Sequence, residues 1–140
     1  MLHGLSALPL LKKLCKLCLT FSKSLTNEDM SVLKDCPWLM SLDLMYSSGI
    51  ENIQFLSSFS KLEVLNLCST KVSSLSPLVG CISLRDIDLR DTGVSDLSPL
   101  QNSTCLRKIK LKRVPLEEEA EWLRKLFSGG ERLASLVRTR

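Results

Sequence analysis

The chain has 140 residues, of which 44% are hydrophobic, 24% are charged and only 5% are aromatic, and its formal net charge is +4. These values are typical of one soluble domain. No stretch reaches the roughly 18 uncharged apolar residues that a membrane-spanning helix needs, so we expect no membrane span. The chain is large enough to fold without disulfides, so its six cysteines predict reduced thiols and a cytoplasmic or nuclear location.

Residues 1–11 are apolar, but they have neither the basic start nor the small-residue cleavage site of a secretory signal. The phrase LSALPLL at 5–11 instead aligns with LSPLVGC at 75–81, so we interpret 1–13 as a partial N-terminal repeat whose strand is absent. Such an edge has no cap, and we expect it to be exposed and to allow self-association or a longer array. Its apolar residues are Leu2, Leu5, Leu8 and Leu11.

The pattern L-x-x-L-x-L, with Ile in some places, begins at residues 14, 39, 62, 84 and 106. The last two intervals are 22 residues long, and the earlier ones are 25 and 23. Alternate side chains of an extended run face opposite sides, so the leucines point inward and successive units stack their strands into a parallel sheet. Residues 14–113 are therefore predicted to form a repeat solenoid of the α/β class.

These residues resemble the leucine-rich-repeat family, in particular the short 22-residue class of the bacterial internalins and of the leucine-rich regulatory subunit of protein phosphatase 1. The phrase TGVSDLSPL at 92–100 is also similar to leucine-rich-repeat proteins of trypanosomatids. The resemblance implies a solenoid with a parallel concave sheet. Where the family commonly has an asparagine that bonds the loop backbone, a hydroxyl replaces it at Ser22, Ser47, Thr70 and Thr92.

After Leu111 the apolar residues change to helical spacing, at Leu116, Ala120, Leu123 and Phe127. Pro115 precedes this run, and two glycines at 129–130 end it. We expect residues 114–140 to be a C-terminal helical cap and tail that covers the last repeat.

Few residues of the sequence are candidates for catalysis or metal binding. His3 is the sole histidine and lies close to the terminus, so we expect no catalytic residue, no metal ligand and no cofactor, and the chain is predicted not to be an enzyme. Cys15 and Cys18 form a C-x-x-C pair, but no second pair completes a zinc site. Asp86, Asp88 and Asp91 are better explained by an ion-pair ladder with Lys108 and Lys110 on the next strand than by a metal.

Three further cysteines have repeat positions that predict their environment. Cys36 and Cys81 share one position and are expected to be small core residues. Cys68 aligns with positions that point away from the core, and we expect an exposed thiol there.

The outward positions of the strands should form the binding surface. Exposed apolar groups at Phe21, Met45 and Tyr46 are typical of protein interfaces, although Phe21 and Tyr46 could also simply pack over neighbouring loops. The candidate partner-binding residues are Phe21, Asp43, Met45, Tyr46, Asn66, Asp88, Arg90, Lys110 and Lys112.

The leading functional hypothesis is a non-catalytic protein–protein interaction module that binds its partner on the concave face. The family resemblance leaves open a regulatory subunit of a Ser/Thr protein phosphatase. Residues 106–140 carry ten Lys or Arg against five Glu, which leaves RNA or DNA binding as a third reading. It is the weakest one, because the basic strand has no interleaved aromatic residues and lies beside the three aspartates.

Overall fold

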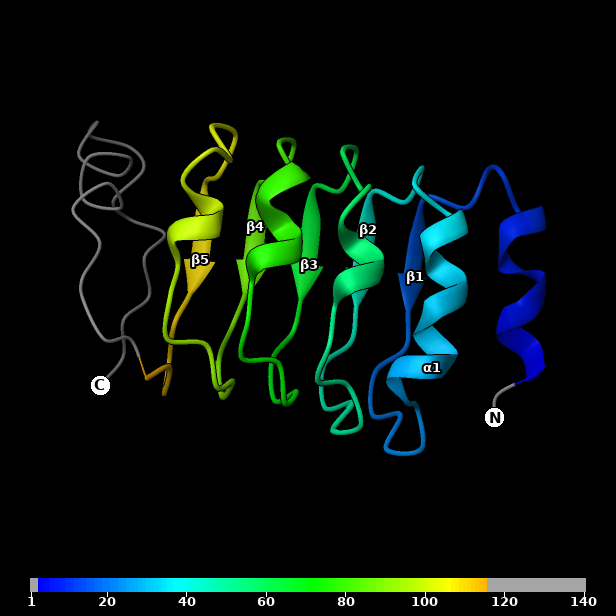
Figure 1. The fold of residues 1–140 in the computed structure, drawn as a ribbon, viewed down its shortest axis with the longest axis horizontal. Helices are drawn as coiled ribbons and strands as arrows, with labels where there is room; N and C mark the ends of the chain where they lie inside the picture. The colour runs from blue at the N-terminus through cyan, green and yellow to red at the C-terminus, as the bar shows by residue number, and fades with distance from the viewer. Residues whose placement is uncertain (1–2, 116–140) are drawn as a thin grey trace.

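The computed structural model describes residues 3–115, which form one parallel five-stranded sheet with helical segments along its opposite side (Figure 1). Each strand pairs with the strand that precedes it and the strand that follows it in the sequence. The strands are β1 (Lys16–Cys18), β2 (Ser41–Asp43), β3 (Val64–Asn66), β4 (Asp86–Asp88) and β5 (Lys108–Lys110). The predicted C-terminal cap lies, from residue 116 onward, outside the described residues.

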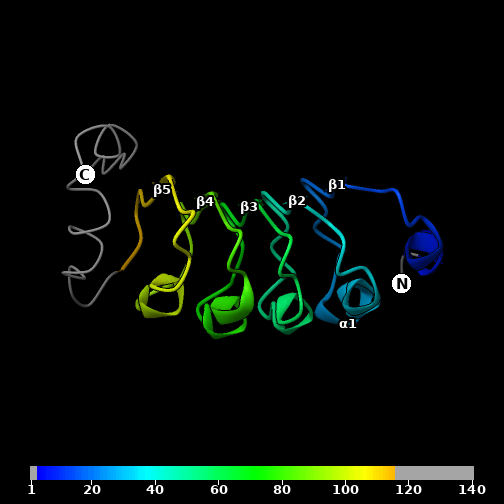
Figure 2. The same cartoon turned by 90° about the horizontal axis from the view of Figure 1, so that it is seen from above.

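The return segments are short helices that lie on one side, with the strands on the other (Figure 2). Pro77 and Pro99 stand in the first turn of their 3₁₀ helices, where a missing N–H costs nothing and the fixed φ favours the turn. The helical segments are η1 (His3–Leu10), α1 (Asn27–Met30), η2 (Ser31–Asp35), η3 (Gln54–Leu56), η4 (Ser76–Gly80) and η5 (Ser98–Leu100).

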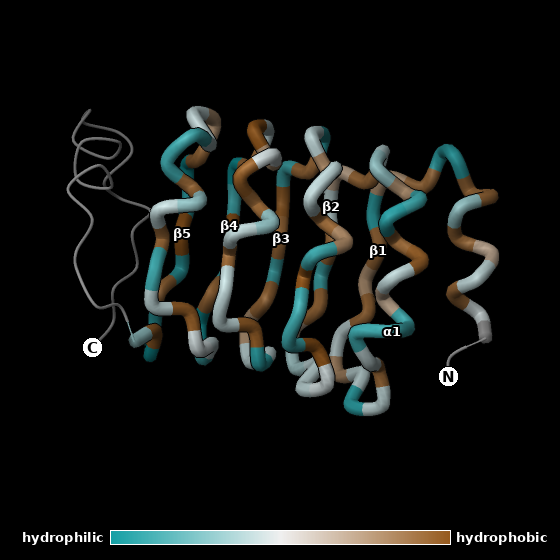
Figure 3. The backbone as a smooth tube through the Cα atoms, in the orientation of Figure 1, coloured by the Kyte–Doolittle hydropathy of each residue, from teal (hydrophilic) through white to brown (hydrophobic). Residues whose placement is uncertain are grey.

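The strand register confirms the predicted stacking. Leu65 of β3 pairs with Leu42 on one side and Ile87 on the other, and the same row continues to Leu17 and Ile109. The inner members from Leu42 to Ile109 are almost completely shielded from solvent. Figure 3 shows hydrophobic positions recurring at equivalent points of successive repeats. Each repeat thus buries its apolar residues only against its neighbours, as expected of a solenoid.

Hydroxyl groups bond the loop backbone where the family has asparagine. Thr70 Oγ1 donates to the Leu67 carbonyl at 2.8 Å, and Thr92 Oγ1 donates to the Leu89 carbonyl at 2.7 Å. Ser47 Oγ instead donates across to the Leu19 carbonyl of the preceding repeat, at 2.7 Å. These three residues are buried, so each hydroxyl finds a hydrogen-bond partner inside the protein.

The 25-residue repeat accommodates its extra residues in α1, which the sequence reasoning missed. Thr26 caps this helix: its Oγ1 accepts the Asp29 N–H at 3.2 Å, while the Asp29 carboxylate accepts the Thr26 N–H at 3.0 Å. This reciprocal capping box satisfies two backbone donors, and the threonine followed three residues later by an acid was the available signal.

The expectation of an exposed N-terminal edge was wrong for Leu8, which is only 8% exposed and joins the core, and Leu5 is half-buried. The reason is that η1 packs against η2 and so acts as the outermost layer of the helical side. Leu11 remains exposed, as expected, and so does Leu10. Leu2 lies outside the described residues.

Two of the cysteine predictions are confirmed and one was wrong. Cys36 and Cys81 are buried. Cys68, expected to be exposed, is also buried, with 4% of its surface accessible. The chain has begun to turn at this point, where the Cys68 N–H donates to Asn66 Oδ1 at 3.0 Å and the Cys68 thiol lies 3.6 Å from Ser69 Oγ.

No helix in the part of the chain that the structure describes is long and apolar enough to cross a membrane.

Candidate functional site

The outward side chains of the strands lie in rows across the sheet, as the register predicts. Lys16, Ser41, Val64, Asp86 and Lys108 pair in sequence along one row. The next row holds four of the predicted site residues beside Cys18, namely Asp43, Asn66, Asp88 and Lys110. Together they give the protein one continuous outward surface, which we call the sheet face.

A shallow depression lies at the centre of the sheet face. Its walls come from β2 to β5, and Leu42, Leu65 and Ile87 contribute to its floor. The outward residues that line it are Ser41, Asp43, Val64, Asn66, Asp86, Asp88, Lys108 and Lys110.

Three of the predicted site residues also have a structural role. Asp43 Oδ1 accepts the Met45 N–H at 3.0 Å, and Asn66 and Asp88 accept the N–H two residues ahead in the same way. This turn ends each strand and directs the chain toward the helical side. Substitution at these positions therefore affects folding as well as recognition.

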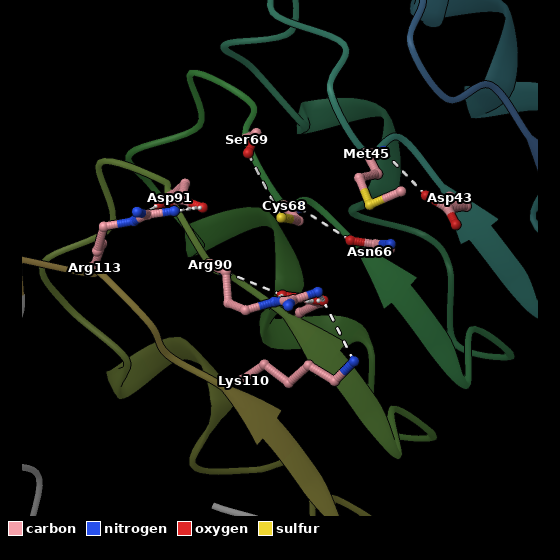
Figure 4. A network of polar contacts seen from close by, with 10 residues as sticks. Asp43, Met45, Asn66, Cys68, Ser69, Arg90, Asp91, Lys110 and Arg113 are labelled. Carbon is pink, nitrogen blue, oxygen red and sulfur yellow. Dashed lines mark hydrogen bonds and ion pairs between the residues drawn. The ribbon is translucent and has the colours of Figure 1, made fainter. Parts of the chain in front are cut away.

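Asp88 is the centre of an ion-pair cluster on β4 and β5. Its two partners, Arg90 and Lys110, are labelled in Figure 4. Its carboxylate accepts from Arg90 Nη2 at 2.6 Å and from Arg90 Nε at 2.9 Å, and Lys110 Nζ approaches to 3.7 Å. The side chain of Asp88 is only 9% exposed, so these contacts are poorly screened by solvent. The hydrogen bonds to Asp88 raise the pKa of the Arg90 guanidinium.

The predicted ion-pair ladder is therefore present for Asp88 and Lys110. Asp86 and Lys108 share the expected register, but no ion pair joins them among the described residues.

A second ion pair lies one residue beyond Arg90. Arg113 donates to both carboxylate oxygens of Asp91, from Nη2 at 2.9 Å and also from Nε. The Arg113 guanidinium lowers the pKa of the Asp91 carboxyl. Neither residue was among the predicted binding residues, although both belong to the ends of neighbouring strands.

The exposed aromatic residues form a pair. The rings of Phe21 and Tyr46 stack with their centroids 4.8 Å apart and their planes at 19°. Phe21 is 65% exposed and Tyr46 is 46% exposed, so the pair leaves much apolar surface in solvent. The two rings do pack over neighbouring loops, since each covers the other, and they remain accessible to a partner.

One position of each repeat has a left-handed backbone, which the sequence did not predict. Its φ values lie between 55 and 60° at non-glycine residues, a conformation that favours glycine and asparagine. Each is the third residue after the end of its strand, and together they form what we call the carboxyl edge of the sheet, composed of Phe21, Tyr46, Ser69, Asp91 and Arg113.

The structure brings the predicted residues together in two groups. Phe21, Met45 and Tyr46 gather near β1 and β2, whereas Asp88, Arg90 and Lys110 gather at β4 and β5. The buried Cys68 and the half-buried Asn66 of β3 lie between them. Lys112 lies half-buried beyond β5, next to Arg113.

The described residues include no cluster of three or more His, Cys, Asp or Glu side chains that could hold a metal ion. Two acidic side chains of the sheet face are engaged instead with other groups: Asp88 with cations and Asp43 with the Met45 N–H. This arrangement can present shape, charge and aromatic surface to a partner.

The strand order, the register and the inward leucines define the fold as a leucine-rich-repeat solenoid. Residues 60–102 match the family model for leucine-rich repeats in two copies. The chain is also similar to the solved structure of internalin C2 from Listeria monocytogenes, with 25% identity and a TM-score of 0.61 over 69% of this chain and 42% of the internalin.

A second internalin from the same organism, inlF, gives a TM-score of 0.64 at 20% identity over 89% of this chain and 46% of that protein. The resemblance to internalins that the sequence indicated is thus confirmed. The chain spans less than half the length of either structure. Comparison with curated proteins gives no significant match.

Solenoids of this kind act as interaction modules through the extended surfaces that their repeats create. The fold alone does not identify a partner, so further assignment depends on the residues of the sheet face.

Proposed function

We propose that the protein is a non-catalytic protein-interaction module that binds its partner on the sheet face, including the carboxyl edge. The observation that carries the proposal is the stacked and exposed Phe21–Tyr46 pair beside a continuous row of outward polar residues. Exposed aromatic residues are typical of the residues that dominate binding energy at protein interfaces, and arginine, present here as Arg90, is another.

The ion pairs support a protein partner over a nucleic acid. Lys110 and Arg113 are engaged with Asp88 and Asp91, so these two cations are not free to bind phosphates. Phosphate binding requires cations that are free to displace counterions, and neighbouring carboxylates oppose it.

The test is affinity capture with the full chain, followed by mass spectrometry, for the unchanged protein and for Tyr46→Ala and Arg90→Ala. Val79→Ser is the matched control, because Val79 is exposed but lies on the η4 helix of the opposite side. We expect one or more proteins that both sheet-face variants lose and the control retains. A partner set that all four proteins share would contradict the proposal, provided that circular dichroism shows them equally folded.

Two finer points remain part of the proposal. The repeat motif resembles that of the leucine-rich phosphatase regulatory subunit, so a Ser/Thr phosphatase catalytic subunit is one partner to look for among the captured proteins. The six free cysteines of the described residues support a reducing compartment, the cytoplasm or the nucleus.

A further inference from the structure

The carboxyl edge differs chemically from one end to the other. At β1 and β2 it carries Phe21 and Tyr46, at β3 it carries the small Ser69, and at β4 and β5 it carries the Asp91–Arg113 pair. Because adjacent strands are joined by backbone hydrogen bonds, this order is fixed by the fold. A partner that runs along the edge therefore meets an aromatic surface first and an ionic one last.

The aromatic end is poorly explained by folding alone. Phe21 and Tyr46 hold left-handed backbone conformations with φ of 56 and 60°, which disfavour bulky residues. Their mutual stacking is worth only about 0.5–1.5 kcal/mol, and both residues stay exposed to solvent. Asparagine or glycine would suit this backbone better, so a ligand contact explains the two aromatic residues more fully than stability does.

The ionic end has an excess of positive charge. The outward residues of β4, β5 and the loops that follow them include three carboxylates and five cations, which leaves two positive charges unbalanced. The carboxylates are Asp86, Asp88 and Asp91, and the cations are Arg90, Lys108, Lys110, Lys112 and Arg113. At the other end, Lys16 of β1 and Asp43 of β2 balance each other.

We propose that the carboxyl edge binds an extended or helical segment of a partner protein that has an apolar or aromatic side chain at one end and aspartate or glutamate at the other. The apolar side chain packs on Phe21 and Tyr46, and the acidic side chains pair with Lys112 and with the other cations of the ionic end. This inference rests on the proposed function, and it adds the chemistry and the direction of the partner.

The strand spacing sets the distance between the two anchors. Three to four strand intervals of about 4.8 Å separate the aromatic pair from the loop after β5, or roughly 14–19 Å. An extended segment covers this distance in about four to six residues. A helix needs about 10–13 residues, or roughly three turns.

Single-stranded nucleic acid also combines stacking bases with negative charge, but the sheet face disfavours it. Asp43 at the aromatic end and Asp86 at the ionic end lie in the rows beside the edge, and neither forms an ion pair among the described residues. A phosphate at every nucleotide would be repelled there, whereas a peptide can place uncharged residues opposite these carboxylates.

The probe is a displayed library of random 16-residue peptides, selected on the full chain. The strongest binders are then synthesised, and their affinities are measured by fluorescence anisotropy for the unchanged protein, Tyr46→Ala and Lys112→Glu. Two matched controls lie off the carboxyl edge: Ile82→Ser changes an exposed apolar group in the turn after η4, and Lys34→Glu changes an exposed lysine of η2. A 16-nucleotide oligo-dT is measured in parallel.

We expect enriched peptides that pair an aromatic or aliphatic residue with Asp or Glu at one of the two spacings. Tyr46→Ala should weaken them about tenfold or more, and Lys112→Glu about threefold to tenfold, with the second effect reduced at high salt. The control variants should bind as the unchanged protein does.

The outcomes separate the two proposals. Binders that Tyr46→Ala weakens but that contain no acidic residues leave the interaction module in place and overturn this inference. Binders that neither variant weakens, or a library without binders, overturn this inference and count against the sheet face as the binding site. Oligo-dT binding that Lys112→Glu abolishes would instead assign the edge to nucleic acid.

Discussion

The carboxylate of Asp88 holds the guanidinium of Arg90, two residues further along the chain, through hydrogen bonds of 2.6 and 2.9 Å, and it also accepts the Arg90 backbone N–H at 3.2 Å. One side chain thus ends a strand and fixes the direction of a candidate binding residue. Asn66 performs the first of these roles in the preceding repeat, without a cation. Comparison of Asp88 with Asn66 shows that the bond to the backbone N–H is the structural part of the contact, because it occurs in both repeats.

Asp88→Ala is expected to lower the free energy of unfolding by about 1–2 kcal/mol, because the Arg90 N–H and guanidinium lose their acceptor. Asp88→Asn should cost less than half as much, since the amide oxygen can accept the backbone N–H as Asn66 does. Urea denaturation of both variants provides the measurement. Equal losses of unfolding free energy in the two variants would show that the hydrogen bond to the Arg90 backbone N–H contributes nothing beyond the charge of Asp88.

Gly49 is expected to tolerate no side chain. A Cβ there would lie 2.1 Å from the Leu25 carbonyl oxygen of the preceding repeat, and this atom is backbone that cannot rotate away. Gly49→Ala should therefore lower the free energy of unfolding by about 2 kcal/mol or more. Gly93→Ala is the matched control, because its Cβ would meet Ser73 at an ordinary 3.5 Å and should change stability by less than about 1 kcal/mol. Similar urea midpoints for the two variants would contradict this close approach.

Stability should fall in alkali through Cys81. Burial raises the pKa of this thiol from 9.0 to about 11 in the folded protein. Below pH 9 both states keep the proton, and between pH 9 and 11 the unfolded state ionises first, so stability is lost as the pH rises. At pH 10 this thiol lowers the free energy of unfolding by about 1 kcal/mol relative to its value below pH 9.

Cys81→Ser isolates this effect, because Ser103 occupies the equivalent position of the next repeat and is buried there. Urea denaturation at pH 8 and pH 10 should show that the unchanged protein loses about 1 kcal/mol more than the variant does. Parallel losses in the two proteins would mean that other groups carry the pH dependence.

Thiol labelling should divide the cysteines into two equal classes. Cys15, Cys18 and Cys105 are exposed and should react quickly with a disulfide reagent in the native protein. Cys36, Cys68 and Cys81 are buried and should react only after unfolding. Denatured but unreduced protein should yield all six thiols, and a smaller number would contradict the proposed reducing compartment.

The fold could be predicted from the sequence because two periods determine it. The alternation within L-x-x-L-x-L decides which residues face inward, and the 22-residue spacing decides which residues become strand partners. The pairing of Leu65 with Leu42 and Ile87 follows from these two facts. The N-terminal end was harder to predict, as the buried Leu8 shows, because the packing of a terminal layer depends on the angle at which it meets its neighbour.

The candidate site was only partly accessible from sequence. The rows of the sheet face follow from register, but the strand ends at Asn66 and the chain turns there, which buries Cys68. The stacking of Phe21 on Tyr46 depends on left-handed backbone angles that neither residue type indicates. Side-chain contacts beyond a strand are set by the turn, and repeat alignment does not describe the turn.

The left-handed residue that follows each strand is a position where very different side chains occur. It occurs once per repeat, and its side chain contributes little to the core, as the series Phe21, Tyr46, Ser69, Asp91 and Arg113 illustrates. In the proposed binding mode, substitutions there change recognition one repeat at a time while the buried leucines stay the same. Specificity is then set at the margin of the sheet, and the main folding constraint at this position is its left-handed backbone.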